Sequence, residues 1–146
     1  MKRAGALVLI LAAIGASAAA ARPSATATVR TAHTRLGTIL VDGRGRTLYL
    51  FTLDTKSIIT CQTGYSNCPA TWPPYLTTGK PTAGKGVNAT LLGTVHRTKP
   101  SGVQVTYNGH PLYVYAFDKK PGDVSGQGFI NYWYVVSPSG NAIKKK

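Results

Sequence analysis

Short apolar runs rich in β-branched and aromatic residues, separated by glycine-containing turns, follow one another along most of the chain. Residues 36–54 and 92–118 both begin with Leu-Gly-Thr, enter a strand-like run and end in a second strand-like run closed by Asp. The intervening turns carry Asp-Gly at 42–43 and Asn-Gly at 108–109, and such pairs between β-rich runs are typical of hairpins. The pattern predicts two related units, each containing a β-hairpin.

The closing run of each unit repeats one aromatic spacing. It reads Tyr-Leu-Phe-Thr-Leu-Asp over 49–54 and Tyr-Val-Tyr-Ala-Phe-Asp over 113–118, so both fit Tyr-x-aromatic-x-x-Asp. Alternate residues of a strand point to opposite faces, which places the aromatic side chains of each run together. The positions are Tyr49, Phe51, Tyr113, Tyr115 and Phe117. The opposite faces are also mainly apolar, so both strands are expected to be central.

A tryptophan follows in each unit. Residues 132–136 read Tyr-Trp-Tyr-Val-Val, a plain strand pattern, whereas 72–75 read Trp-Pro-Pro-Tyr. Proline cannot donate to a β-ladder, so the first stretch is expected at an edge or in an irregular segment. The fold class predicted is mostly β, a small sandwich or barrel-like domain of two related hairpin-containing repeats.

The boundaries follow from these patterns. The domain is expected over 35–143, with repeat one at about 36–76, a connector at 77–91 that is rich in Thr, Gly, Lys and Pro, and repeat two at about 92–140. Residues 22–34 lack periodicity and predict a flexible leader. Residues 144–146 form a basic tail.

The first 21 residues have the features of a secretory signal peptide. A basic start at 1–3 precedes an apolar run over 4–13 and two Ala-x-Ala cleavage patterns. The run is too short to span a bilayer, although an uncleaved anchor is the alternative. The protein is therefore expected to be secreted, whether extracellular, periplasmic or associated with the cell envelope.

Composition adds a strong charge imbalance. The chain has 17 Lys plus Arg against 4 acids, all of them Asp, for a net charge of +13. Loss of a signal over 1–21 leaves 15 basic and 4 acidic residues, or +11. The chain has no Glu and contains 16 Gly and 9 Pro, so helices are disfavoured. The absence of Glu also leaves few carboxylates for acid–base catalysis.

Cys61 and Cys68 both follow the signal and meet an oxidising compartment, where an even number of cysteines predicts a disulfide. Closing a loop this short is worth about 2.5 kcal/mol in the chain-entropy model. A metal pair is the rival interpretation, but a tetrahedral site needs about four ligands, and no His lies nearby in sequence.

The ordered series of these motifs resembles a bacterial family of secreted repeats of unknown function, lipoprotein-like proteins with a Tyr-x-(Phe/Trp/Tyr)-x-x-Asp motif. The Cys-Pro-Ala-Thr-Trp-Pro-Pro stretch at 68–74, the run from Val105 to Tyr113 and the segments at 121–128 and 133–140 carry the resemblance. It covers about residues 35–140. Many relatives are lipid-anchored, whereas this chain has no cysteine at the end of its signal. The resemblance implies a compartment but no reaction.

Two interpretations of the aromatic motif compete. Aromatic side chains bury large areas and favour strands, so Tyr49, Phe51, Tyr113 and Tyr115 are candidates for core packing. Presented on a surface, they would instead form a platform for a sugar, a base or a porphyrin. Burial of the tyrosine hydroxyls separates the two.

Asp54 and Asp118 close the motif strands, where Asp commonly accepts bonds from nearby backbone N–H groups. Pseudo-symmetry between the repeats offers an alternative, in which the two carboxylates meet as a cation site or as the acid–base pair of a hydrolase-like enzyme. No recognisable catalytic constellation supports that enzyme, so we expect a non-enzymatic protein.

His110 follows the Asn-Gly turn and is expected to hydrogen-bond locally. A haem or metal carrier using His110 is the alternative, although the chain's one Met, at position 1, leaves with the signal. We therefore expect no cofactor. The basic side chains are either a solvated surface or a means of attachment to anionic envelope polymers; no nucleic-acid motif is present. The function expected is a secreted or envelope-associated binding or structural module.

Overall fold

The computed structural model describes residues 25–56, 58–62 and 68–145. The expected signal peptide at 1–21 lies outside the described residues. The architecture is mostly β, built from three short sheets that are not closed into a barrel. None of the helices in the described ranges has both the length and the apolar character needed to cross a bilayer.

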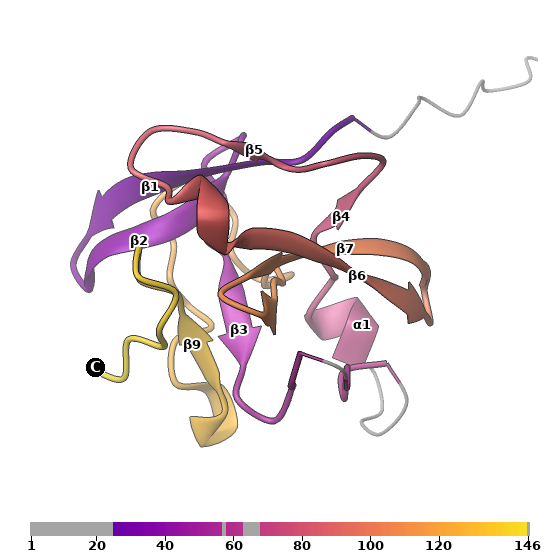
Figure 1. The fold of residues 1–146 in the computed structure, drawn as a ribbon. Helices are drawn as coiled ribbons and strands as arrows, with labels where there is room; N and C mark the ends of the chain where they lie inside the picture. Colours follow the sequence, from indigo (N-terminus) through magenta and orange to yellow (C-terminus); the bar gives the residue numbers. More distant parts are fainter. Residues whose placement is uncertain (1–24, 57, 63–67, 146) are drawn as a thin grey trace, which may run out of the picture.

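The first sheet has the order β2-β1-β5. Strands β1 (Thr28–Thr34) and β2 (Gly37–Asp42) form an antiparallel hairpin, and β5 (Thr82–Ala83) joins β1 in parallel. This sheet lies across the top of Figure 1. The expected flexible leader is therefore wrong for residues 28–34. Apolar and polar residues do not alternate clearly over 28–34, because β1 buries few apolar side chains. The strand is held in place by backbone pairing with β2 on one edge and with β5 on the other.

A second sheet has the order β4-β7-β6, with β8 also paired to β7. Its strands are β4 (Leu76–Thr77), β6 (Leu92–Thr98), β7 (Ser101–Tyr107) and β8 (His110–Pro111). Asn108 and Gly109 connect β7 to β8 with φ of 49° and 77°. Positive φ at both positions matches the tight hairpin turn predicted from Asn-Gly. The 3-10 helix η1 (Ala89–Leu91) precedes β6.

The third sheet pairs strand β3 (Tyr49–Phe51) with strand β9 (Trp133–Val135). The 3-10 helix η2 (Phe129–Asn131) precedes β9. On its other side β3 meets the segment around Tyr113, which in turn bridges to Pro74. The Trp-Pro-Pro-Tyr stretch thus lies alongside the second motif, and Pro73 contributes its carbonyl as acceptor for Val114 N–H. The predicted edge position of these prolines agrees with this arrangement.

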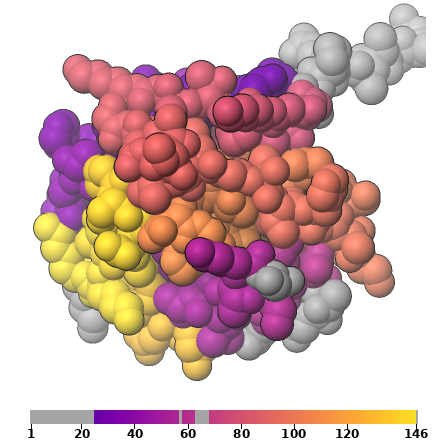
Figure 2. Space-filling view, in the orientation of Figure 1, coloured from indigo at the N-terminus to yellow at the C-terminus, as the bar shows by residue number. Residues whose placement is uncertain are grey.

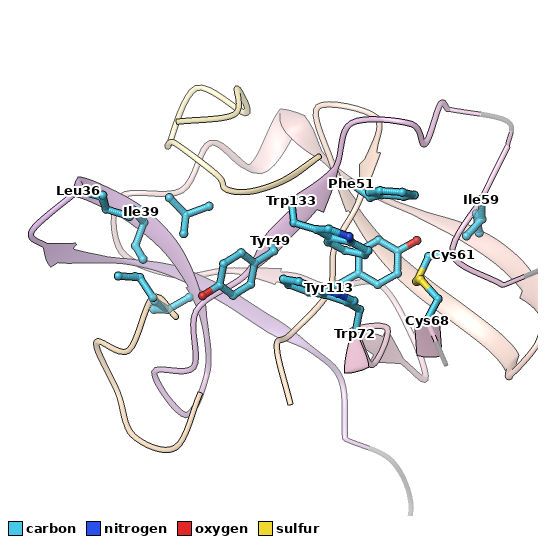
Figure 3. Packing of buried hydrophobic residues seen from close by; sticks show 13 residues of the cluster. Leu36, Ile39, Tyr49, Phe51, Ile59, Cys61, Cys68, Trp72, Tyr113 and Trp133 are labelled. Atoms are coloured by element: carbon cyan, nitrogen blue, oxygen red, sulfur yellow. A yellow bond between two sulfur atoms is a disulfide. The ribbon is translucent and has the colours of Figure 1, made fainter. Parts of the chain in front are cut away.

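Two apolar clusters lie on opposite faces of β3. Tyr49 and Phe51 point into one cluster, together with Trp72, Tyr113 and Trp133 (Figure 3). Leu48 and Leu50 point into the other, which also contains Leu112, Val114 and Val136. The central position predicted for the first motif strand is therefore confirmed. In the second motif only the beginning is buried, because the chain turns after Tyr115 and leaves Phe117 60% exposed.

Cys61 and Cys68 form the predicted disulfide, with Cα atoms 5.4 Å apart. Cys68 begins the single-turn helix α1 (Cys68–Thr71), and both cysteines belong to the cluster that contains Trp72.

We expect mass spectrometry of the secreted, unreduced protein to show a Cys61–Cys68 cross-link and no free thiol, because both sulfur atoms are already bonded and buried. The number of alkylated cysteines is compared before and after reduction. Two alkylatable thiols in native material would contradict the bond.

Candidate functional site

The two motifs meet directly at the centre of the molecule. Tyr49 N–H donates to the carbonyl of Tyr113 at 2.8 Å, and Tyr113 N–H donates to the carbonyl of Tyr49 at 3.0 Å. These two bonds make one antiparallel pair from the same position of each repeat. The repeats are therefore joined through the motif itself.

The side chains of the motifs are exchanged between the repeats. The Tyr49 hydroxyl donates to Asp118 Oδ2 at 2.7 Å, and the Tyr113 hydroxyl donates to Asp54 Oδ2 at 2.5 Å. Figure 3 shows the two hydroxyls pointing away from each other. Each tyrosine thus binds the aspartate of the other motif, and the two carboxylates have separate sets of partners. We call these the two Tyr–Asp pairs.

The Tyr113–Asp54 pair is the more buried of the two. Asp54 is 4% exposed, and its Oδ1 accepts from Thr60 N–H at 2.6 Å. Burial raises the pKa of the Asp54 carboxyl, although bonds from Tyr113 and Thr60 oppose that rise. Burial and the neighbouring Asp54 also raise the pKa of the Tyr113 phenol far above its usual value. This phenol therefore stays protonated and acts as a hydrogen-bond donor.

The Tyr49–Asp118 pair has the same kinds of hydrogen bonds but lies closer to solvent. Asp118 is partly buried, and its Oδ1 accepts from Ser125 N–H at 2.9 Å. Burial and the bond to Asp118 raise the pKa of the Tyr49 phenol far above its usual value. Gly126 N–H also approaches the Tyr49 hydroxyl at 3.3 Å. Each aspartate therefore ties the turn after its own strand to a tyrosine of the other repeat.

A buried cation, Arg97, lies beside the Tyr113–Asp54 pair and was not singled out in the sequence. It is 3% exposed, and its guanidinium donates to Gln104 Oε1 at 2.7 Å and to the carbonyl of Cys61 at 3.0 Å. Burial lowers the pKa of Arg97, while Tyr113 and Asp54 oppose that change. The spacing of residues in the sequence does not distinguish Arg97 from the exposed basic residues, because its burial depends on the segments that pack over β6.

The aromatic side chains of both repeats form one continuous stack. The Phe51 and Trp133 rings are 4.4 Å apart, the Trp133 and Trp72 rings 3.9 Å apart, and the Trp72 and Tyr115 rings 4.4 Å apart. The first two contacts are nearly parallel, with interplanar angles of 15° and 4°. The buried ring faces therefore cover one another in this conformation.

The tyrosine hydroxyls, whose burial separates the two interpretations of the motif, lie inside. Tyr49 and Tyr113 are 0% exposed and Phe51 is 1% exposed, whereas Tyr115 is partly exposed. A flat ligand has no open face on the three buried rings without displacing a neighbouring side chain. The geometry is that of packing.

His110 lies on β8, at the turn where the sequence places it. It is partly buried, and its Nδ1 has no hydrogen-bond partner among the residues that the structure describes, so the local hydrogen bond expected of His110 is not made by this atom. Burial lowers the pKa of His110, the effect of Lys56 adds to that, and nearby Asp54 opposes it. Among the residues that the structure describes, no three His, Cys or Asp side chains are grouped to hold a metal ion.

The internal repeat agrees with a comparison against known families. A family model described as a secreted repeat of unknown function matches twice, at residues 30–75 and 94–137. The chain belongs to this family. The match confirms the resemblance derived from the motifs, and it places the protein among secreted proteins in general. No curated protein and no solved structure matches the chain.

The two family matches meet in space as well as in sequence. Tyr49 and Asp54 lie in the first match, and Tyr113 and Asp118 lie in the second. Each Tyr–Asp pair therefore joins one copy of the secreted repeat to the other. In this chain, the repeated Tyr-x-aromatic-x-x-Asp motif forms a contact between the two copies.

Proposed function

We propose that this secreted-repeat protein is a non-enzymatic binding module that associates with anionic polymers of the bacterial envelope. The observation that carries the proposal is the asymmetry between its charges. The four aspartate side chains accept bonds from the protein's own groups, whereas most of the described cations face solvent.

Each Asp has internal donors. Asp42 accepts from the backbone of Arg44 and Arg46 and from the Arg46 guanidinium at 2.9, 2.9 and 2.7 Å. Asp54 and Asp118 belong to the Tyr–Asp pairs described above. The side chain of Asp123 accepts from two backbone N–H groups, those of the adjoining lysines 119 and 120, at 2.8 and 3.0 Å.

The basic side chains show the opposite distribution. Within the described ranges, a single ion pair joins a basic side chain to a carboxylate, that between Arg46 and Asp42. The exposed basic residues are Arg30, Arg35, Arg44, Arg46, Lys56, Lys80, Lys85, Lys99, Lys119, Lys120, Lys144 and Lys145. Because so few of these cations are paired with the protein's own carboxylates, the surface attracts polymers that carry phosphate or carboxylate groups.

We expect the protein to bind lipid-free, isolated cell wall at low salt and to be released as the salt concentration rises. Exposed charges act over about 8 Å at physiological ionic strength and about 3 Å at 1 M. Deleting residues 144–146 should reduce the bound fraction measured by co-sedimentation.

A matched control removes three charges elsewhere. Lys80→Gln/Lys85→Gln/Lys99→Gln lowers the net charge equally but leaves the C-terminal cations in place. We expect it to bind wall better than the truncated chain. Retention on wall that is unchanged at 1 M salt would reject attachment by charge.

A further inference from the structure

Three cations gather around one cavity. The cavity has a volume of about 440 Å³, and its lining includes Arg35, Lys144, Lys145 and Tyr134. Its described lining contains no carboxylate. Like charges held close together repel one another, and an anion in the cavity would remove that cost.

The backbone, and not chance contact of mobile side chains, brings these cations together. The Gln127 side chain donates to the carbonyls of Ile143 and Lys145 at 2.6 and 2.9 Å, while its own oxygen accepts from Val135 N–H at 2.9 Å. The C-terminal segment is thereby fixed beside β9 and close to the β1–β2 turn. In Figure 2 these yellow residues lie against the indigo ones. The expected basic tail is thus part of the folded surface up to Lys145.

An exposed apolar turn lies directly beside this cavity. Gly128 and Asn131 line the cavity, and between them Phe129 and Ile130 are 41% and 53% exposed. Ile130 has a φ of 47°, a left-handed conformation that is a genuine outlier for a β-branched residue. The turn therefore holds an unfavourable backbone conformation while it leaves two large apolar side chains in water.

More apolar surface and more positive charge continue the same face. Phe117 is 60% exposed, and the rings of Phe117 and Phe129 lie 5.3 and 6.2 Å from that of Tyr115. The Lys119 ammonium lies 5.7 Å from the centre of the Phe117 ring. Cations thus flank the apolar side chains both at the cavity and at Phe117.

We propose that this face docks on an anionic phospholipid bilayer. The cavity formed by Arg35, Lys144 and Lys145 takes a headgroup phosphate, and Phe129 and Ile130 enter the interface between headgroups and acyl chains. Cations beside exposed apolar side chains are the combination that binds such surfaces. A polymer in water would require the cations alone. This inference does not depend on the proposed attachment to envelope polymers.

The variant Ile130→Asn tests the inference. Asn tolerates the left-handed conformation, so the fold should be kept or stabilised while the apolar side chain is lost. We expect its affinity for vesicles of phosphatidylglycerol and phosphatidylcholine to fall about tenfold, measured by co-sedimentation. Ile58→Asn removes another exposed apolar side chain, 62% exposed, and should bind as the wild type does.

Two further arms identify the source of the attraction. Arg35→Gln/Lys144→Gln/Lys145→Gln should bind the anionic vesicles more weakly than the triple variant of residues 80, 85 and 99. Binding of Ile130→Asn to soluble polyphosphate should equal that of the wild type. Wild-type affinity of Ile130→Asn for the vesicles, or no vesicle binding by the wild type, would overturn membrane docking without touching the polymer proposal.

Discussion

Replacing Trp133 with alanine is expected to lower the free energy of unfolding by about 3–5 kcal/mol, as large-to-small changes of buried aromatic residues do. Trp133 is 2% exposed and stacks on Phe51 from the first repeat. Its other neighbours are Trp72 in a parallel stack and Tyr113 edge-on, at 3.9 and 5.0 Å. The loss therefore removes contacts on several sides. Denaturant unfolding followed by circular dichroism measures it.

Phe117→Ala is the matched control, since Phe117 belongs to the outer end of the same aromatic series but is 60% exposed. Surface substitutions of this kind usually change stability by less than about 0.5 kcal/mol. A loss below about 1 kcal/mol for Trp133→Ala, or equal losses for both variants, would contradict a stack that holds the repeats together.

Features set by local chemistry could be predicted from the sequence. The Asn-Gly turn at 108–109 needs only residues that tolerate positive φ, and the disulfide needs only two cysteines in an oxidising compartment with a short spacer. The burial of Tyr49 and Phe51 on one face, with Leu48 on the other, follows from the period of a strand.

Features set by the placement of distant segments could not be predicted. Strand β1 has few apolar residues, and besides its hairpin with β2 it pairs with β5, about fifty residues away. The burial of Arg97 depends on acceptors at Cys61 and Gln104, which no spacing connects. The motif residues were recognisable, but their exchange between repeats needs the central antiparallel pair, which only the folded chain supplies.

The exchange explains why one hexapeptide carries both an aromatic donor and an acid. A tyrosine in one repeat needs an acceptor for its buried hydroxyl, and the aspartate of the other repeat needs donors for its buried carboxylate. With the same motif on both sides of the central pair, each repeat supplies what the other lacks. Two copies of one short sequence thereby satisfy each other's buried polar groups where the repeats meet.

A double-mutant cycle tests this exchange. Tyr113→Phe should cost about 1–3 kcal/mol, because it leaves the buried Asp54 carboxylate without one donor. Asp54→Asn should couple to Tyr113→Phe by about 0.5–3 kcal/mol, whereas Asp118→Asn, in the same motif as Tyr113 but bonded elsewhere, should add independently. Tyr49→Phe should cost less than Tyr113→Phe, since water can reach the partly exposed Asp118. Unfolding free energies of the single and double variants give the couplings, and coupling within a repeat instead of between repeats would reject the exchange.

The same variants separate a structural motif from a binding motif. If the Tyr–Asp pairs serve the contact between repeats, Asp118→Asn should lower stability by about 0.5–3 kcal/mol, as is usual for point changes of this kind. Its binding to cell wall and to anionic vesicles, measured well below the melting temperature, should be no weaker than that of the wild type, because the change removes a negative charge and leaves every cation, including the adjacent Lys119, in place. A stable Asp118→Asn protein that no longer binds would assign the carboxylate to a ligand. The more exposed of the two pairs is the sharper test, since Asp118 is the motif acid that solvent, and therefore a ligand, can approach.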